Sequence, residues 1–270
     1  MPWSAWSAIK LDDPDVQDFV FRVVIGAIIS GLTHMAGYLP TTKPICDRPS
    51  IFYGTLHGAL VGTCALLVTT EMVPVNWWSR FGAPMSVGYM VYDIMAYCLP
   101  KVDVLLTIHH LFVVILVVPP CIPKAAIICA AGDSPEWPLT SAAFMFMMEL
   151  SVPPLNYRWY LTNTLNRSAL RYVTNSLILG ATWTLRLGVC VINVYLFWQD
   201  GKITRHMERG TADVAAMFIV GHAVMFCMSM YWGYRLIRLG LWKFLVFIPP
   251  PVVTAGGRNR ICKIKEDRFR

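Results

Sequence analysis

Long apolar runs with few charged residues alternate with short polar connections along this chain. A helix needs about 20 apolar residues to cross the hydrocarbon core of a membrane. Seven stretches approach or exceed that length: 19–39, 51–72, 81–99, 103–118, 137–153, 172–198 and 212–239. The pattern therefore predicts an all-α integral membrane protein, with about seven transmembrane helices that form a bundle or barrel.

Two places interrupt this regular pattern. The segment 122–131 offers only about ten apolar residues, too few to span a membrane, so it is either a re-entrant turn or the start of the fifth helix. Pro153 and Pro154 lack the amide hydrogens that would bond the carbonyls of Glu149 and Leu150. We expect the fifth helix to kink or end there.

The composition agrees with a membrane protein. Hydrophobic residues make up 56% of the chain and charged residues 14%, against about a quarter charged in soluble domains. Residues 1–18 lack the apolar core of a cleavable signal peptide, so the first run should stay as an anchor. The eight cysteines contain no C-x-x-C pair, which argues against a disulfide framework or a zinc site, and we expect no metal.

Charge sets the expected orientation. The net charge of +7 comes largely from the tail after the last run. This favours contact with anionic lipid over binding of nucleic acid. With the N-terminus outside, the inside would hold Lys43, Arg48, Lys101, Arg158, Arg167, Arg171 and the tail from Arg235, and the outside Lys10, Arg80, Lys124, Lys202, Arg205 and Arg209. We expect an N-terminal tail (1–18), a transmembrane domain (19–239) and a basic cytosolic tail (240–270), disordered from 249 onward.

Adjacent histidines, His109 and His110, lie in the middle of the apolar run 102–120. Ionisable groups at that depth are costly and usually face the interior of a helix bundle, where they indicate function. Residues next to each other on a helix point about 100° apart, so only one of the pair can face a given partner. The alternative is that both simply hydrogen-bond to neighbouring helices.

Other polar residues also recur within the apolar runs. Ser86, Tyr89, Asp93 and Tyr97 share one helix face, as do Asn175, Thr182, Arg186 and Asn193. Five of the six histidines lie in runs: His34, His57, His109, His110 and His222. Such residues can pair locally between helices, and the ridge Gly54, Gly58 and Gly62 suits close packing. Because ionisable groups of both signs are so numerous, we expect a shared polar cavity, lined by the His109–His110 pair, in place of scattered pairs.

An ordered set of motifs links the chain to a known family. The motifs are Ser50 with Leu56-His57-Gly58, Gly88-Tyr89-Met90-Val91-Tyr92-Asp93, His109-His110-Leu111, Glu149-Leu150-Ser151-x-Pro153-x-x-Asn156-x-Arg158-Trp159, Arg186 and Tyr231-Trp232. With this set the chain resembles the TLC-domain family, which includes ceramide synthases and smaller TLC-domain-containing proteins. The chain has no His-Asp pair near Glu149, unlike ceramide synthases. Its Glu-x-Ser-x-Pro pattern is similar to the smaller members.

The resemblance implies a role in membrane lipid homeostasis, in the endoplasmic reticulum. One hypothesis is an enzyme that transfers an acyl group from acyl-CoA, its co-substrate, to an amine or hydroxyl of a lipid. His109 or His110 would act as general base or nucleophile, and Asp93 would orient the imidazole. The residues expected to bind substrate are His57, Tyr89, Glu149, Ser151, Asn156, Arg158 and Arg186. No other cofactor is implied.

The second hypothesis is a non-catalytic protein that binds lipid, organises the membrane or handles cargo. In that case the same polar residues would hold a lipid headgroup or order the helices. Both hypotheses take membrane lipids as partners, and both leave the oligomeric state open.

The expected orientation makes a prediction about glycosylation. Asn166-Arg-Ser is an N-glycosylation sequon, and with the N-terminus outside it faces the cytosol. We therefore expect the chain to migrate identically on a gel before and after treatment with an endoglycosidase. A glycan on Asn166 would overturn the orientation. A sequon introduced beside Lys202, on the expected outer side, serves as the positive control.

Overall fold

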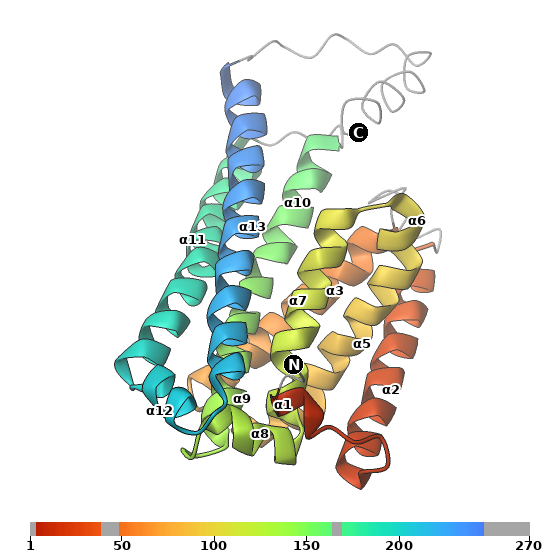
Figure 1. Cartoon of the computed structure of the whole chain (residues 1–270). Coiled ribbons are helices and arrows are strands. Elements are labelled where there is room, and N and C mark those ends of the chain that lie inside the picture. The colour runs from red at the N-terminus through yellow and green to blue at the C-terminus, as the bar shows by residue number, and fades with distance from the viewer. Residues whose placement is uncertain (1–3, 39–48, 164–168, 246–270) are drawn as a thin grey trace, which may run out of the picture. The chain divides into compact units, whose positions relative to one another are not determined.

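A computed structural model of the chain describes residues 4–38, 49–163 and 169–245, and every regular element in these ranges is a helix (Figure 1). The expected all-α class is confirmed for this part of the chain. The sequon at Asn166, the basic residues Lys43, Arg48 and Arg167, and the tail 246–270 lie outside the described residues. The chain divides into two units, and the first, Met1–Met230, holds all the side chains discussed below.

Five described helices are long and apolar enough to cross a membrane. They are α2 (Pro14–Ala36), α3 (Pro49–Thr69), α7 (Val104–Cys121), α11 (Ala169–Gln199) and α13 (Ala212–Leu245). Length and composition of these helices fit a multi-pass membrane protein. The five histidines of the apolar runs all lie in them.

The other two expected spans fall on helical stretches that are interrupted. The run 81–99 follows the short helix α4 (Val75–Trp77) and lies on the π-turn η1 (Trp78–Gly82), α5 (Ala83–Asp93), the π-turn η2 (Ile94–Cys98) and α6 (Leu99–Lys101). The run 137–153 lies on α9 (Glu136–Phe146), the 3₁₀ turn η3 (Met147–Ser151) and α10 (Val152–Asn163). Among the described residues, five of the seven expected spans thus correspond to helices long and apolar enough to cross a membrane, and the other two, on interrupted stretches, are not confirmed.

The interruption before Pro153 and Pro154 matches the expected effect of those prolines. The α-helix α9 ends at Phe146, and α10 begins at Val152, which places both prolines in its first turn. A missing amide hydrogen costs little in a first turn. Carbonyls near the break are bonded by side chains of α11: Arg186 donates to the Met148 oxygen at 3.2 Å, and Asn175 to the Pro154 oxygen at 3.0 Å.

The doubtful segment 122–131 forms a short helix of its own, α8 (Pro123–Ala130). It begins after Ile122, whose backbone is extended, and ends at Ala131, whose φ is +48°. The short helices α1 (Ser4–Ser7) and α12 (Lys202–Glu208) lie at the same end of the first unit as α8 (Figure 1).

Ion pairs and hydrogen bonds tie this end of the first unit together. The helix α2 begins at Pro14, earlier than expected, because Asp13 caps it and accepts from the amide of Asp15 at 3.1 Å. Lys124 of α8 donates to Asp13 at 2.5 Å, which holds the pKa of that carboxyl below its usual value. Asp133 pairs with both Lys202 and Arg205. Lys124, Lys202 and Arg205, all expected outside, therefore lie at one end.

Ser4 also anchors the N-terminal helix here. Its amide and its hydroxyl donate to the carboxylate of Asp213, at the start of α13, at 2.5 and 2.8 Å. These bonds join the beginning of the described chain to its last long helix.

Glycines set the closest helix contacts. On α3, a side-chain Cβ at Gly58 would lie 2.8 Å from the Cβ of Val152, and one at Gly62 would lie 2.9 Å from Leu150. The expected ridge therefore does pack closely, against η3 and α10. On α5, a Cβ at Gly88 would lie 2.4 Å from the carbonyl oxygen of Val23 on α2. Only a glycine lets these backbones approach so closely.

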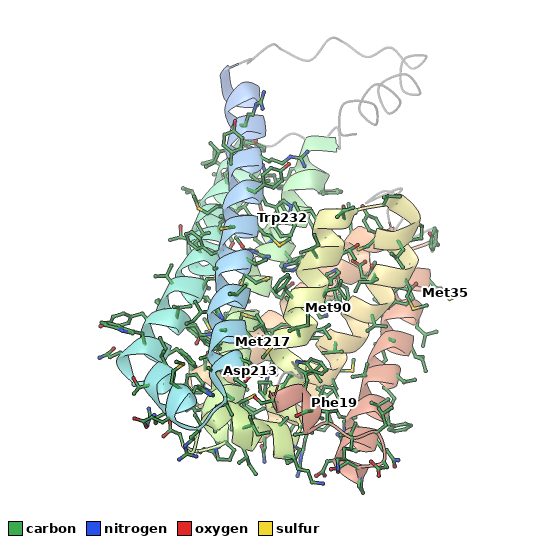
Figure 2. All side chains as sticks on the ribbon, in the orientation of Figure 1. Phe19, Met35, Met90, Asp213, Met217 and Trp232 are labelled. Carbon is green, nitrogen blue, oxygen red and sulfur yellow. The ribbon has the colours of Figure 1, made fainter. Side chains whose placement is uncertain are left out.

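The buried and exposed apolar residues are on opposite sides of the helices. Met90 of α5 is 1% exposed among the helices, whereas Met35 of α2 is 67% exposed and projects away from them (Figure 2). Large exposed apolar side chains recur along α2, α3 and α11. Such a surface suits contact with lipid tails.

The contact at Gly88 can be tested by substitution. Gly88→Ala places a methyl group against the backbone of α2, and overpacking of this kind costs about 1–3 kcal/mol. We expect a lower melting temperature in detergent. Gly180 is the matched control, since nothing lies within 4 Å of the position that an added Cβ would take there. Gly180→Ala should keep or raise the melting temperature, and equal losses in both variants would contradict the packing.

Candidate functional site

A buried carboxylate, Asp93, joins three helices. It is the last residue of α5 and is 4% exposed. Its Oδ2 lies 2.8 Å from Nε2 of His110 on α7 and 3.6 Å from Sγ of Cys98. Its Oδ1 accepts a hydrogen bond from the hydroxyl of Tyr53 on α3. Hydrogen bonds from three side chains thus offset the cost of burying this acid.

The two adjacent histidines face different partners. His110 bonds to Asp93, whereas His109, 5% exposed, lies within electrostatic range of the Arg186 guanidinium. Their ring centroids are 5.3 Å apart. The angle between successive residues of a helix explains this division.

Arg186 is the second buried ionic centre. Its Nε donates to the hydroxyl of Ser229 at 3.1 Å, and one terminal nitrogen donates to Ser151 at 3.3 Å as well as to Met148. The charge of Glu149, which is 8% exposed, acts on Arg186 and on Tyr89. Glu149 and Ser151 come from η3, so the 3₁₀ turn carries both toward the arginine.

His57 and Tyr89 connect the Asp93 cluster to a cavity. Their rings stack with centroids 3.6 Å apart and planes inclined by 6°, and Tyr89 meets His110 edge-on at 6.0 Å. Nε2 of His57 is buried and has no hydrogen-bond partner among the described residues. A buried imidazole nitrogen without a hydrogen-bond partner can form a hydrogen bond with a ligand.

The cavity has a volume of about 230 Å³ and lies between α2, α3 and the stretch η1–α5. Tyr53, His57 and Tyr89 form its polar wall. Exposed apolar residues, among them Ile29, Leu60 and Phe81, also line the cavity, which therefore opens at the outer surface of these helices. The expected cavity lined by the histidine pair is not confirmed, because His109 and His110 are not among the residues that line this cavity; Tyr89, which does line it, meets His110 edge-on.

Asn156 and Arg158 lie further along α10 and hold helices together. Asn156 donates to the hydroxyl of Thr55 at 2.8 Å and to the carbonyl of Ile51 at 3.3 Å, which fastens α10 to α3. Arg158 donates to the hydroxyl of Tyr172 on α11 at 3.0 Å. The contacts of Asn156 and Arg158 therefore join α10 to its neighbouring helices α3 and α11.

Sequence reasoning missed Tyr53 and Cys98. Tyr53 precedes His57 by four residues and therefore shares its helix face, a signal that could have identified it. Cys98 follows Asp93 by five residues, a spacing that places two side chains on different faces of a regular α-helix. The π-turn η2 brings Cys98 onto the same side as Asp93. The sequence contains no signal that predicts this turn.

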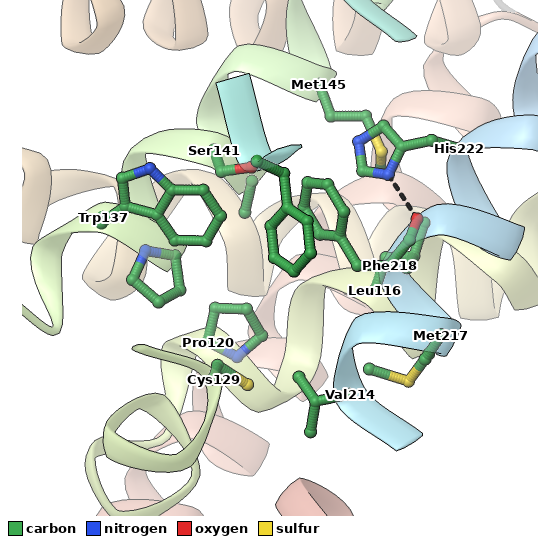
Figure 3. Close-up of a pocket in the computed structure, with 13 residues that line it drawn as sticks. Leu116, Pro120, Cys129, Trp137, Ser141, Met145, Val214, Met217, Phe218 and His222 are labelled. Carbon is green, nitrogen blue, oxygen red and sulfur yellow. Dashed lines mark hydrogen bonds between the residues drawn. The ribbon is translucent and has the colours of Figure 1, made fainter. Parts of the chain in front are cut away.

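A separate polar cluster joins α9, α11 and α13. Asn193 accepts from the Ser141 hydroxyl at 2.9 Å and donates to the Ser141 carbonyl at 3.1 Å and to His222 at 3.0 Å. His222 in turn donates from Nδ1 to the carbonyl of Phe218 at 2.8 Å (Figure 3). Every polar atom of this cluster has a partner, so the cluster orders helices. The adjoining hollow of about 30 Å³ has room for little more than water.

A family model for the TLC domain matches residues 50–238. The matched range contains all the expected site residues and excludes α2, which forms one wall of the cavity. No curated protein and no solved structure is significantly similar to the chain.

Proposed function

Because the chain belongs to the TLC-domain family, we propose that it is a membrane protein of lipid homeostasis that binds a lipid in its interior. One acyl chain occupies the cavity between α2, α3 and α5, and the polar part of the lipid bonds to His57 and Tyr89. The cavity is the observation that supports this function, since it combines an apolar lining with an unpartnered buried nitrogen.

The size and opening of the cavity favour an acyl chain. An apolar cavity of about 150 Å³ can hold a benzene molecule, so 230 Å³ accommodates a segment of a chain while the remainder stays in the bilayer. The open side is bordered by exposed apolar residues of α2 and α3. A lipid tail can therefore enter sideways from the membrane without crossing water.

Lipid binding predicts a specific labelling pattern. A phospholipid with a photoactivatable acyl chain should cross-link to α2 and α3 beside the cavity, as mapped by mass spectrometry. Cys64 lines the cavity, and Cys64→Trp should lower labelling about tenfold, equivalent to about 1.4 kcal/mol. Cys227→Trp is the control, since Cys227 is an exposed cysteine on α13. Equal labelling of wild type and Cys64→Trp would overturn the proposal.

Acyl transfer from acyl-CoA to an amine or hydroxyl of the bound lipid is the second candidate function. The hydrogen bond between Asp93 and His110 favours it. An ionised Asp93 accepts a hydrogen bond from the protonated Nε2 of His110. The lone pair of the imidazole is then on Nδ1. That nitrogen has no hydrogen-bond partner among the residues described.

In this reaction the amine or hydroxyl of the lipid attacks the thioester carbonyl while Nδ1 of His110 takes its proton. The CoA thiolate then leaves and receives that proton. Arg186 or His57 stabilises the developing oxyanion. The enzyme would act in the endoplasmic reticulum, as family membership suggests. The alternative is a protein that uses the same interior only to hold lipid, and so organises the membrane or handles cargo.

Variants of His110 and Asp93 distinguish acyl transfer from lipid binding alone. In the purified protein, His110→Ala and Asp93→Asn should lower acyl transfer by about 10²–10⁴ and leave photolabelling of the cavity unchanged. His222→Gln alters a buried histidine of the separate cluster and should keep most activity. If cells carrying His110→Ala have the lipid profile of wild type while deletion of the protein alters it, the protein does not act by acyl transfer.

A further inference from the structure

Three different ligand types meet at Asp93. Oδ2 of Asp93, Sγ of Cys98 and a ring nitrogen of His110 lie within 4.8 Å of one another. All three residues are buried, with exposed fractions of 4%, 0% and 4%. They come from two helical stretches, so the chain must fold before the ligand atoms meet.

The local backbone brings Cys98 into this group. In a regular α-helix, residues five apart point about 140° away from each other at 100° per residue. Between Asp93 and Cys98 the helix instead forms the π-turn η2, over Ile94–Cys98. The wider turn places the thiol 3.6 Å from the Asp93 carboxylate. Turns of this kind are rare and occur frequently at functional sites.

We propose that Asp93, Cys98 and His110 bind a zinc ion, with a fourth position open to water or a ligand. Imidazole, thiolate and carboxylate are the three side-chain groups that bind zinc, and three protein ligands with one open position are typical of catalytic zinc sites. One thiolate and one carboxylate neutralise the two charges of the ion. The bound site then carries no net charge, which lowers the cost of burial among apolar helices.

Two of the three ligand separations are near those of a zinc site. Zinc lies about 2.3 Å from sulfur and about 2.0–2.2 Å from nitrogen or oxygen, so its ligand atoms are roughly 3–4 Å apart. The Asp93–Cys98 distance of 3.6 Å already fits, and the Asp93–His110 distance of 2.8 Å must widen slightly. Tyr53, which donates to the other oxygen of Asp93, would hold the carboxylate in place. Tyr53 also lines the cavity.

Zinc on Nε2 puts the proton of His110 on Nδ1. His110 is then a ligand and cannot act as the base of the second candidate function. Lipid binding in the cavity does not depend on the metal, so each can fail without the other.

Metal analysis of the purified full-length protein tests this site. Protein reconstituted with Zn²⁺ and then desalted should retain one zinc per chain, and Cys98→Ala should retain less than about a tenth of that. Cys129→Ala is the matched control, because Cys129 is buried but lies on α8 outside the cluster. Equal zinc content in wild type and Cys98→Ala would overturn the proposal.

A second measurement needs no variant. Co²⁺ added to the metal-free wild-type protein should give the charge-transfer absorption of a thiolate ligand, and X-ray absorption of the zinc form should show one sulfur at about 2.3 Å. A zinc shell without sulfur would refute the site even if zinc is retained. Photolabelling beside Cys64 on the same samples reports lipid binding independently.

Discussion

The cost of burying charge among apolar helices governs this structure. Asp93, Glu149, Arg186 and the two adjacent histidines lie between helices whose outer faces are apolar. Each buried ionic group is tolerated only because hydrogen bonds or opposite charges compensate for lost hydration. Asp93, for example, is hydrogen-bonded by three side chains, one each from α3, α7 and η2. The arrangement of the helices and the pairing of the buried polar groups therefore depend on each other.

Irregular helix turns bring several of these polar side chains together. The π-turn η2 presents Cys98 to Asp93, and the 3₁₀ turn η3 presents Glu149 and Ser151 toward Arg186. Irregular backbone at membrane depth must have its freed polar groups satisfied by protein. Arg186 and Asn175 do so by bonding to carbonyls near η3. The departures from a regular helix thus lie beside the polar groups that they position.

The helix α2 links the family domain to the cavity. It lies before the matched range 50–238, yet Ile29, Ser30 and Thr33 line the cavity. Close contact at Gly88 holds α2 against α5, and the space that remains between α2 and α3 is where a lipid chain would enter. In the proposed function, residues of α2 therefore contact the bound lipid chain.

The lengths of the apolar runs in the sequence determined the helical class, the apolar segments and the histidines within them, because each follows from local composition. The glycine ridge and the effect of Pro153 and Pro154 were likewise local, and both are present. Only the tertiary structure decided that His110 and not His109 meets Asp93, that Cys98 joins them and that the cavity is walled by Tyr53 and Tyr89. These contacts depend on helix rotation and on a π-turn. Both are set by packing between distant segments, and neither leaves a periodic signal in the sequence.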